Sequence, residues 1–337
     1  MVYINDIQNQ ALKYIASDGR GVAARLADKF RISRQAANKH LQALLAAGLV
    51  DAEGNTRGRI YRLRALQQAE RSFNCAGLME DVFWREVCVS VITGLPENVR
   101  DIWRYGMTEM VNNAIEHSGS AEVHAGIRRN AVYTDGWVAD DGVGIFFKIQ
   151  QAFNLYDPRE AILELAKGKL TTDPDHHTGE GIFFTSRVFD AFDIQSGRLY
   201  FMHDHESLDV LVERPVDAPG SLVLMRLGND SKRTLQSVFD EFAAPEAYTF
   251  DKTVVPVRLA QYEGEKLVSR SQAKRLTMRF ERFHHVVLDF EGVAEIGQAF
   301  ADELFRVFAS AHPGIWLEPV NMTKAVSRMV TRARAHQ

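Results

Sequence analysis

The sequence predicts an α+β protein built from several domains, and three observations support this fold class. The chain begins with three helical patterns followed by two short strands, and its final part alternates regularly between strands and helices. Between these parts, helices and strands are mixed, and two separate pairs of glycines occur. A chain of 337 residues is long enough for two or three domains. We expect domains over residues 1–66, 67–230 and 231–337.

The composition indicates a globular protein without a membrane span. Hydrophobic residues make up 46% of the chain and charged residues 25%, which is typical of a protein with a sizeable core. No apolar run reaches the ~18 residues that a membrane helix needs. The N-terminal MVYINDIQNQ lacks the pattern of a secretory signal, and Cys75 and Cys88 form no CxxC motif. We therefore expect a reduced, cytoplasmic chain with no membrane partner.

The N-terminal unit combines three helices with a hairpin. The helices are expected over residues 5–17, 21–30 and 33–48. Ser33 is placed as the N-cap of the third helix, and Gly48 ends it. Two short strands around a Gly/Asn turn follow within residues 49–64. This order of elements resembles a winged helix-turn-helix domain.

The charge of this unit predicts a polyanionic partner. Residues 1–66 carry 11 Lys and Arg against 5 Asp and Glu, whereas the rest of the chain carries 29 against 39. The exposed face of the third helix and the hairpin tip offer side chains that can bond bases and phosphates: Arg34, Gln35, Asn38, Lys39, Arg57 and Arg59. We expect these residues to bind DNA. A winged helix used for protein contacts remains the alternative.

The middle unit is expected to mix helices and strands. Residues 67–98 are expected to contain mixed helical segments and a break at GLPEN. A helix follows from about 99 to 117, and strands follow over 121–130 and 131–140. Two glycine pairs come next, in ADDGVGIFF and in HHTGEGIFFTSRVFD. The second pair opens a helix, whose free N–H groups suit phosphates. A P-loop is excluded because Leu163 and Leu170 stand where it needs Gly and Ser or Thr, and neither pair completes a dinucleotide fingerprint.

Three boxes in this unit resemble those of the Bergerat-fold (GHKL) ATPases, which include gyrase, sensor histidine kinases and anti-sigma-factor kinases. The first box is Glu109 with Asn113, four residues apart on one helix. The second is DxGxG, here residues 140–144, and the third is the glycine pair at 179–181. The strand GSLVLMRL, residues 220–227, is similar to the closing strand of the family. The resemblance implies an α/β-sandwich over roughly residues 69–230.

The resemblance also implies ATP and Mg²⁺ as cofactors and gives each residue a role. Asn113 would complete an octahedral Mg²⁺ site made mostly of phosphate and water oxygens, and Glu109 would orient or deprotonate the attacking group. Asp140 would accept hydrogen bonds from the adenine amino group. The remaining expected ATP-binding residues form the adenine wall and the phosphate cradle: Gly142, Gly144, Thr178, Gly179, Gly181, Ile182 and Thr185.

The segment between the second and third boxes, residues 148–178, corresponds to the ATP lid of the family. It is expected to hold a helix over residues 157–170, with Asp157 as cap and Pro158 in its first turn. Lys167 and Lys169 either approach the nucleotide or belong to an exposed basic loop. The histidines at 176–177 and around 203–205 do not have the spacing of a zinc site.

The final unit alternates between strand and helix. Strands are expected within residues 250–260, 284–293 and 314–321, and helices within 270–283, 296–311 and 323–335. The run VVLDFEGVAEIGQAFADELF resembles STAS-like domains, specifically the type often found attached to ATPases of this sort. Ala299 stands where the switchable STAS proteins carry a phosphorylated Ser. A docking or dimerisation domain without covalent chemistry is therefore favoured, with a protein partner for this domain.

Two functions remain open, and a third is weaker. The first is a DNA-binding regulator whose assembly or DNA affinity is controlled by binding or hydrolysis of Mg-ATP, working as a homodimer. The alternative is an anti-sigma-type serine/threonine kinase that acts on a partner protein. A scaffold without catalysis is disfavoured because Glu109 and Asn113 are both present. Whether ATP is hydrolysed, transferred or only sensed is left open by the sequence.

Overall fold

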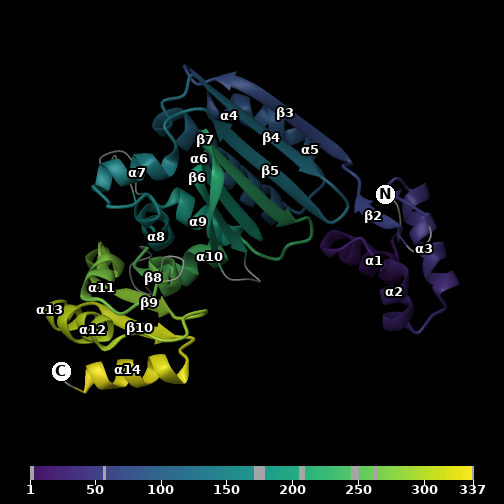
Figure 1. Cartoon of the computed structure of the whole chain (residues 1–337). Coiled ribbons are helices and arrows are strands. Elements are labelled where there is room, and N and C mark those ends of the chain that lie inside the picture. The colour runs from purple at the N-terminus through teal and green to yellow at the C-terminus, as the bar shows by residue number, and fades with distance from the viewer. Residues whose placement is uncertain are drawn as a thin grey trace.

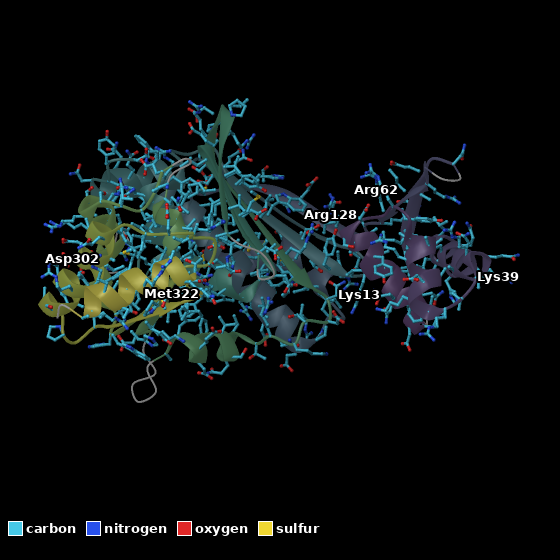
Figure 2. All side chains as sticks on the ribbon, turned by 60° about the horizontal axis from the view of Figure 1, so that its bottom comes forward. Lys13, Lys39, Arg62, Arg128, Asp302 and Met322 are labelled. Carbon is cyan, nitrogen blue, oxygen red and sulfur yellow. The ribbon has the colours of Figure 1, made fainter. Side chains whose placement is uncertain are left out.

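The protein has a mixed α/β fold with three β-sheets in the described part of the chain (Figure 1). The computed structural model describes residues 4–55, 58–170, 179–204, 209–243, 250–261 and 265–335. The N-terminal helices and the C-terminal sheet lie at opposite ends of the molecule, with the largest sheet between them (Figures 1 and 2). No helix among the described residues is both long and apolar enough to span a membrane.

Three helices and a two-stranded sheet form the N-terminal unit, as expected. Their bounds are α1 Asp6–Ser17, α2 Val22–Phe30, α3 Arg34–Ala46, β1 Val50–Glu53 and β2 Ile60–Leu63. The Oγ of Ser33 accepts a hydrogen bond from the backbone N–H of Ala36 at 3.1 Å, so the predicted N-cap of α3 is confirmed. The unit has a hydrophobic core of its own, and Ala131 and Val132 pack against that core.

The largest sheet is antiparallel, with the strand order β3-β4-β5-β7-β6. Its strands are β3 Gln67–Asn74, β4 Glu122–Arg129, β5 Tyr133–Asp140, β6 Ala191–Asp204 and β7 Val210–Gly228. Buried residues alternate with less buried ones along β5, so one face of the sheet packs against helices. The predicted strands over 121–130, 131–140 and 220–227 are confirmed.

Helices cover this apolar face. They are α4 Glu80–Phe83, the π-helical turn Trp84–Cys88, α5 Val89–Ile92, α6 Glu97–His117 and α9 Gly181–Val188. Trp103 of α6 is fully buried and stacks edge-on against Phe189, with 4.8 Å between ring centroids. Gly136 of β5 lies against the same ring, because a Cβ there would come within 2.4 Å of Trp103. This close approach fixes α6 on the centre of the sheet.

Helical segments occur within residues 67–98 as expected, but the first part of this range is a strand that was not predicted. Residues 67–74 form the edge strand β3, which pairs antiparallel with β4 from Gln67 opposite Arg129 to Asn74 opposite Glu122. Most side chains of β3 are exposed, and only Ala69 and Phe73 pack against the core. These two residues are four apart and lie among Gln, Glu and Arg, so the local pattern favours a helix, and tertiary pairing overrides it.

The C-terminal unit is a parallel sheet with the strand order β10-β9-β8, packed with helices. Its elements are β8 Lys252–Pro256, the 3-10 turn Val257–Ala260, α11 Arg270–Thr277, the 3-10 turn Phe280–Arg282, β9 His285–Asp289, α12 Gln298–Asp302, the π-helical turn Glu303–Phe308, α13 Ala309–Ala311, β10 Trp316–Val320 and α14 Lys324–Arg334. The predicted alternation of strands and helices is thereby confirmed. One hydrophobic core extends from this unit into the middle of the chain. The preceding helix is α10, Leu235–Phe242. It packs against α9 through the rings of Phe239 and Phe184, whose centroids are 4.5 Å apart.

Two helices occupy the described part of the predicted lid, α7 Ile145–Phe153 and α8 Glu160–Lys167. The helix expected over residues 157–170 is shorter than predicted, because residues 157–159 form a turn. Oδ1 of Asp157 accepts from the backbone N–H of Arg159 at 2.8 Å and does not cap the helix, which begins at Glu160 without a side-chain cap. Gly168, with φ of 80°, ends α8. Residues 171–178, including His176 and His177, lie outside the described residues.

Candidate functional site

A cavity of about 320 Å³ lies where α6, β5, α7, α8, α9 and β7 meet. This volume is in the range of small-molecule sites in proteins. Seven of the residues predicted from the sequence line the cavity: Glu109, Asn113, Asp140, Gly144, Gly179, Gly181 and Ile182. They come from three segments that are distant in sequence. The fold therefore brings the three predicted boxes together around one hollow.

Helix α6 presents Glu109, Asn113 and His117 to the cavity. Their spacing of four residues places them on one face of the helix. The Nδ2 of Asn113 is buried and has no hydrogen-bond partner in the described part of the chain. An unsatisfied buried amide costs stability, so its position on a cavity wall marks a polar group that a ligand can satisfy.

Asp140 stands at the end of β5, half-buried in the cavity wall. Burial raises the pKa of its carboxyl, against the lowering effect of hydrogen bonds from the backbone of Gly142 and Ser221, and Asp141 raises it further. The bond from the Gly142 N–H to Oδ1 is 2.9 Å long. A carboxylate has about four acceptor positions, so Asp140 has the capacity to accept further bonds from a ligand that donates them.

The two glycines of the second box have different surroundings. Gly144 lines the cavity in a left-handed conformation, φ 83°, where a Cβ would come within 2.6 Å of Ser196 Oγ. Gly142 packs instead against the end of α6, and a Cβ there would come within 2.1 Å of the Ser118 carbonyl. Gly142 thus shapes the turn after β5 and does not line the cavity.

The third box opens α9 beside the catalytic candidate. Gly181 is the first residue of α9, and a Cβ added to it would lie 2.0 Å from Oε2 of Glu109. The carbonyl of Gly179 accepts a hydrogen bond from the Leu170 N–H at 3.0 Å, which ties this box to the lid. Gly181 and Ile182, in the first turn of α9, line the cavity. The first N–H groups of a helix have no partner within the helix and attract anions.

One more predicted residue lies outside the cavity, and two fall outside the described residues. Thr185 is fully buried on α9 and packs toward Gly106 of α6, and it does not line the cavity. Its hydroxyl has no hydrogen-bond partner among the described residues. Thr178 and Arg57 lie outside the residues that the structure describes.

The basic face of the N-terminal unit is open to solvent. Arg34, Gln35, Asn38 and Lys39 are all exposed on α3, and Figure 2 shows Lys39 at the outer end of the molecule, pointing away from it. Arg59 differs, because it is half-buried with its guanidinium 5.6 Å from the centroid of the Tyr61 ring. The helix α3 is therefore accessible to a large partner.

Lys148 and Ser221 are among the polar residues of the cavity wall that sequence reasoning missed. Lys148 of α7 donates from Nζ to the carbonyl of His117 at 2.6 Å, and burial lowers its pKa. Ser221 of β7 accepts at Oγ from the Ile145 N–H at 2.9 Å. A lone cation in the apolar run IFFKIQQAF, directly after the second box, is the signal that identifies Lys148.

Lys167 and Lys169 were expected either near the nucleotide or in an exposed loop, and the structure places them in neither position. Lys167 is fully buried, and its Nζ donates to Glu164 at 2.6 Å and to the Met278 carbonyl at 2.9 Å. Lys169 donates from Nζ to the Arg282 carbonyl at 2.9 Å. Both side chains therefore point toward the C-terminal unit.

The residues of the cavity fit a magnesium nucleotide better than a metal held by protein alone. No group of three or more His, Cys, Asp or Glu side chains in the described ranges is arranged to hold a metal ion. Mg²⁺ usually takes only one or two protein ligands and completes its shell with phosphate and water. The side-chain amide of Asn113, the half-buried carboxylate of Asp140 and the helix start at Gly181 suit such a ligand.

Comparison with known proteins bears on the C-terminal unit. Among curated proteins, none matches the chain. Residues 272–327 match the family model described as the STAS-like domain of unknown function, DUF4325. This match extends from α11 into α14 and confirms the predicted resemblance of the C-terminal unit. Ala299 is exposed at the start of α12 within it. The chain therefore contains a STAS-like domain near its C-terminus.

Proposed function

We propose that this protein binds Mg-ATP in the cavity, in the manner of Bergerat-fold ATPases, and uses it to control a DNA-binding N-terminal unit of the winged-helix type. The observation that carries the proposal is the convergence of Glu109, Asn113, Asp140 and Gly181 on one cavity. Four residue types with distinct chemistry, matching the order of the family boxes, seldom meet in this way by chance.

The purine is assigned to the Asp140 end of the cavity. A carboxylate only accepts hydrogen bonds when ionised, and the adenine amino group donates them. Gly144 leaves the wall without a side chain beside this carboxylate. Val138 and Val223, which also line the cavity, supply apolar surface for a flat ring.

The phosphates are assigned to the opposite side, between α6 and the start of α9. The N–H groups at Gly181 and Ile182 and the positive end of α9 attract anions, and the buried amide of Asn113 gains a partner. Bound Mg²⁺ would neutralise charge on the phosphates. Glu109, on the same face of α6, is placed as general base for water or a hydroxyl.

DNA binding is assigned to α3 on the basis of its exposed polar face and the basic charge of residues 1–66. The effect of ATP on DNA affinity is limited by how much more tightly ATP binds one conformation of the protein than the other, typically ~1–3 kcal/mol. A homodimer, which presents two such helices, is the expected DNA-binding form.

A second candidate, a serine/threonine kinase, would use the same position of Glu109. Glu109 lines the cavity beside the start of α9, where a base for either hydrolysis or phosphoryl transfer is needed. Ala299 offers no hydroxyl in the STAS-like domain, so the acceptor would belong to a partner protein. Incubation with γ-labelled ATP and candidate partners separates the two: label on protein indicates a kinase, and free phosphate alone an ATPase.

The proposal is tested by calorimetric titration of the purified chain with a non-hydrolysable ATP analogue, with and without Mg²⁺. Saturable binding that needs Mg²⁺ and is lost in Asp140→Asn is the expected result. Absence of binding in every condition would remove the nucleotide assignment. Repeating a DNA-binding assay at saturating analogue then tests the coupling.

A further inference from the structure

The C-terminal unit supports two walls of the cavity from outside. Leu165 and Leu170 line the cavity from α8 and the residues that follow it, and Phe183 lines it from α9. Helix α8 packs against β8 and the 3-10 turn Val257–Ala260 of the C-terminal unit. The ring of Phe183 packs against that of Phe250, just before β8, with 4.7 Å between centroids. Both walls therefore have the cavity on one side and the C-terminal unit on the other.

Three buried charges cross this interface. Glu164 and Lys167 of α8 are 2% and 0% exposed, and Arg279 of the STAS-like domain is 7% exposed. Oε1 of Glu164 accepts from Lys167 Nζ at 2.6 Å, while Oε2 accepts from Arg279 at 2.9 Å. One carboxylate thus joins a cation of its own helix to a cation of the STAS-like domain.

Arg279 also holds the backbone just beyond α8. Its second guanidinium nitrogen donates to the carbonyl of Gly168 at 2.9 Å and to the carbonyl of Lys169. These two residues have φ of 80° and 49°, so the chain reverses sharply here and leads directly to Leu170 in the cavity wall. The planar fork of arginine is suited to holding a carboxylate and carbonyls at once.

The backbone of Arg279 is itself in an unfavourable conformation. Its φ is 66°, in the left-handed region that glycine adopts without strain. A glycine there would relieve the strain but would hold neither Glu164 nor the two carbonyls. The arginine side chain therefore contributes contacts that offset the strain of its own backbone.

We propose that Arg279 of the STAS-like domain is a positioning residue for the nucleotide pocket. It fixes the end of α8 so that Leu165 and Leu170 lie against the bound nucleotide. This inference rests on the proposed nucleotide function. The STAS-like domain then regulates the pocket of the same chain, because loss of the contacts between Arg279 and α8 destabilises the cavity wall. Coupling between two sites is reciprocal, so nucleotide binding also stabilises the contacts of Arg279.

The main test compares Arg279→Met with Arg306→Met. The first variant leaves Glu164 paired with Lys167, so no uncompensated charge remains buried. The control removes an arginine of the same domain that pairs with Asp302 within its own helix segment. Titration with the Mg²⁺ complex of a non-hydrolysable ATP analogue should give about a tenfold weaker affinity in Arg279→Met and an unchanged affinity in Arg306→Met. Equal affinity of the wild-type chain and Arg279→Met would overturn the inference.

Two further measurements separate positioning from plain loss of structure. Arg279→Gly relieves the backbone strain, so it should lose affinity as Arg279→Met does while melting at a higher temperature than Arg279→Met. In the wild-type chain, the analogue should slow amide hydrogen exchange in residues 275–283, which do not line the cavity. Unchanged exchange there, with nucleotide bound, overturns the coupling. Failure of the wild-type chain to bind the analogue would overturn the nucleotide proposal itself, and the role of Arg279 with it.

Discussion

Glu109 of α6 lies directly against Gly181, the first residue of α9. No side chain fits between them, because a Cβ on Gly181 would come within 2.0 Å of Oε2 of Glu109. The contact joins the first and third boxes of the pocket, and it sets the distance between the acidic side chain and the N–H groups assigned to the phosphates. Substitutions at either residue therefore test the chemistry of the pocket separately from its affinity.

We expect Gly181→Ala to lower turnover of ATP with little change in melting temperature. The added methyl group meets only the end of a flexible side chain, so Glu109 can move aside without disturbing the backbone. Its displacement from the reacting group is what costs rate. Steady-state hydrolysis and thermal denaturation measure the two effects. Gly314→Ala, at a glycine with nothing within 4 Å, is the control.

We expect Glu109→Gln to bind the ATP analogue normally while turnover falls ~10²–10⁴-fold, the usual contribution of a general base. Gln keeps the size of the side chain but has no basic carboxylate. The matched variant is Glu116→Gln, on an exposed position of the same helix. If both variants turn over ATP at the wild-type rate, Glu109 is not the base.

We expect Asp140→Asn to weaken adenine-nucleotide binding by at least about tenfold, since hydrogen bonds to charged groups contribute ~1.5–3 kcal/mol. The same change should raise the melting temperature of the ligand-free chain at neutral pH. Burial raises the pKa of Asp140, so its ionised form is penalised in the folded state. Asp101→Asn, at an exposed carboxylate of α6 that does not line the cavity, should alter neither property. A parental affinity in Asp140→Asn would contradict the assignment of the purine.

The pH dependence of nucleotide affinity follows from the same shift. A carboxyl whose folded pKa lies above its unfolded value contributes stability at low pH that is lost as the pH rises through the folded pKa. Nucleotide binding needs the ionised form, so the affinity should fall as the pH is lowered through the raised pKa of Asp140. Calorimetric titrations across the acidic range measure this fall. The fall should be absent from the residual binding of Asp140→Asn.

We expect Lys39→Gln to reduce the slope of log affinity for DNA against log salt by about one, because one phosphate contact is lost. Lys39 points away from the molecule at its outer end, whereas Lys13 lies on α1 (Figure 2). Lys13→Gln is therefore the control and should leave the slope unchanged. Equal slopes in the wild-type chain and both variants would argue against α3 as the DNA-binding helix.

Local patterns were sufficient to predict those helices and strands in which the spacing of residues along the sequence agrees with which of them are buried. The four-residue spacing of Glu109 and Asn113, the cap at Ser33 and the strand–helix alternation of the C-terminal unit are all local features. Strand β3 was missed because its two core contacts, Ala69 and Phe73, have helical spacing. Only its pairing with β4 makes it a strand, and that pairing is not encoded in the segment itself.

The remaining misses are relationships between distant residues. Lys167 was expected either near the nucleotide or in an exposed basic loop, yet its partners include the carbonyl of Met278, far along the chain. Arg279 belongs to no recognisable sequence motif. Its contact with Glu164 depends on how the C-terminal unit packs against α8. Lys148 and Ser221 likewise reach the cavity only through tertiary structure. Spacing along one element cannot predict such pairs.

The order of strands in the large sheet has a consequence for synthesis of the chain. Strands β3, β4 and β5 pair with neighbours in sequence, whereas Asp140 at the end of β5 pairs with Ser221 of β7. The long loop closed by that pairing holds α7, α8 and α9, three walls of the cavity. Closing it carries the largest entropic penalty in the sheet. A ribosome must therefore release β7 before the cavity can form, and a nascent chain that stalls earlier exposes the apolar faces of all three helices to chaperones.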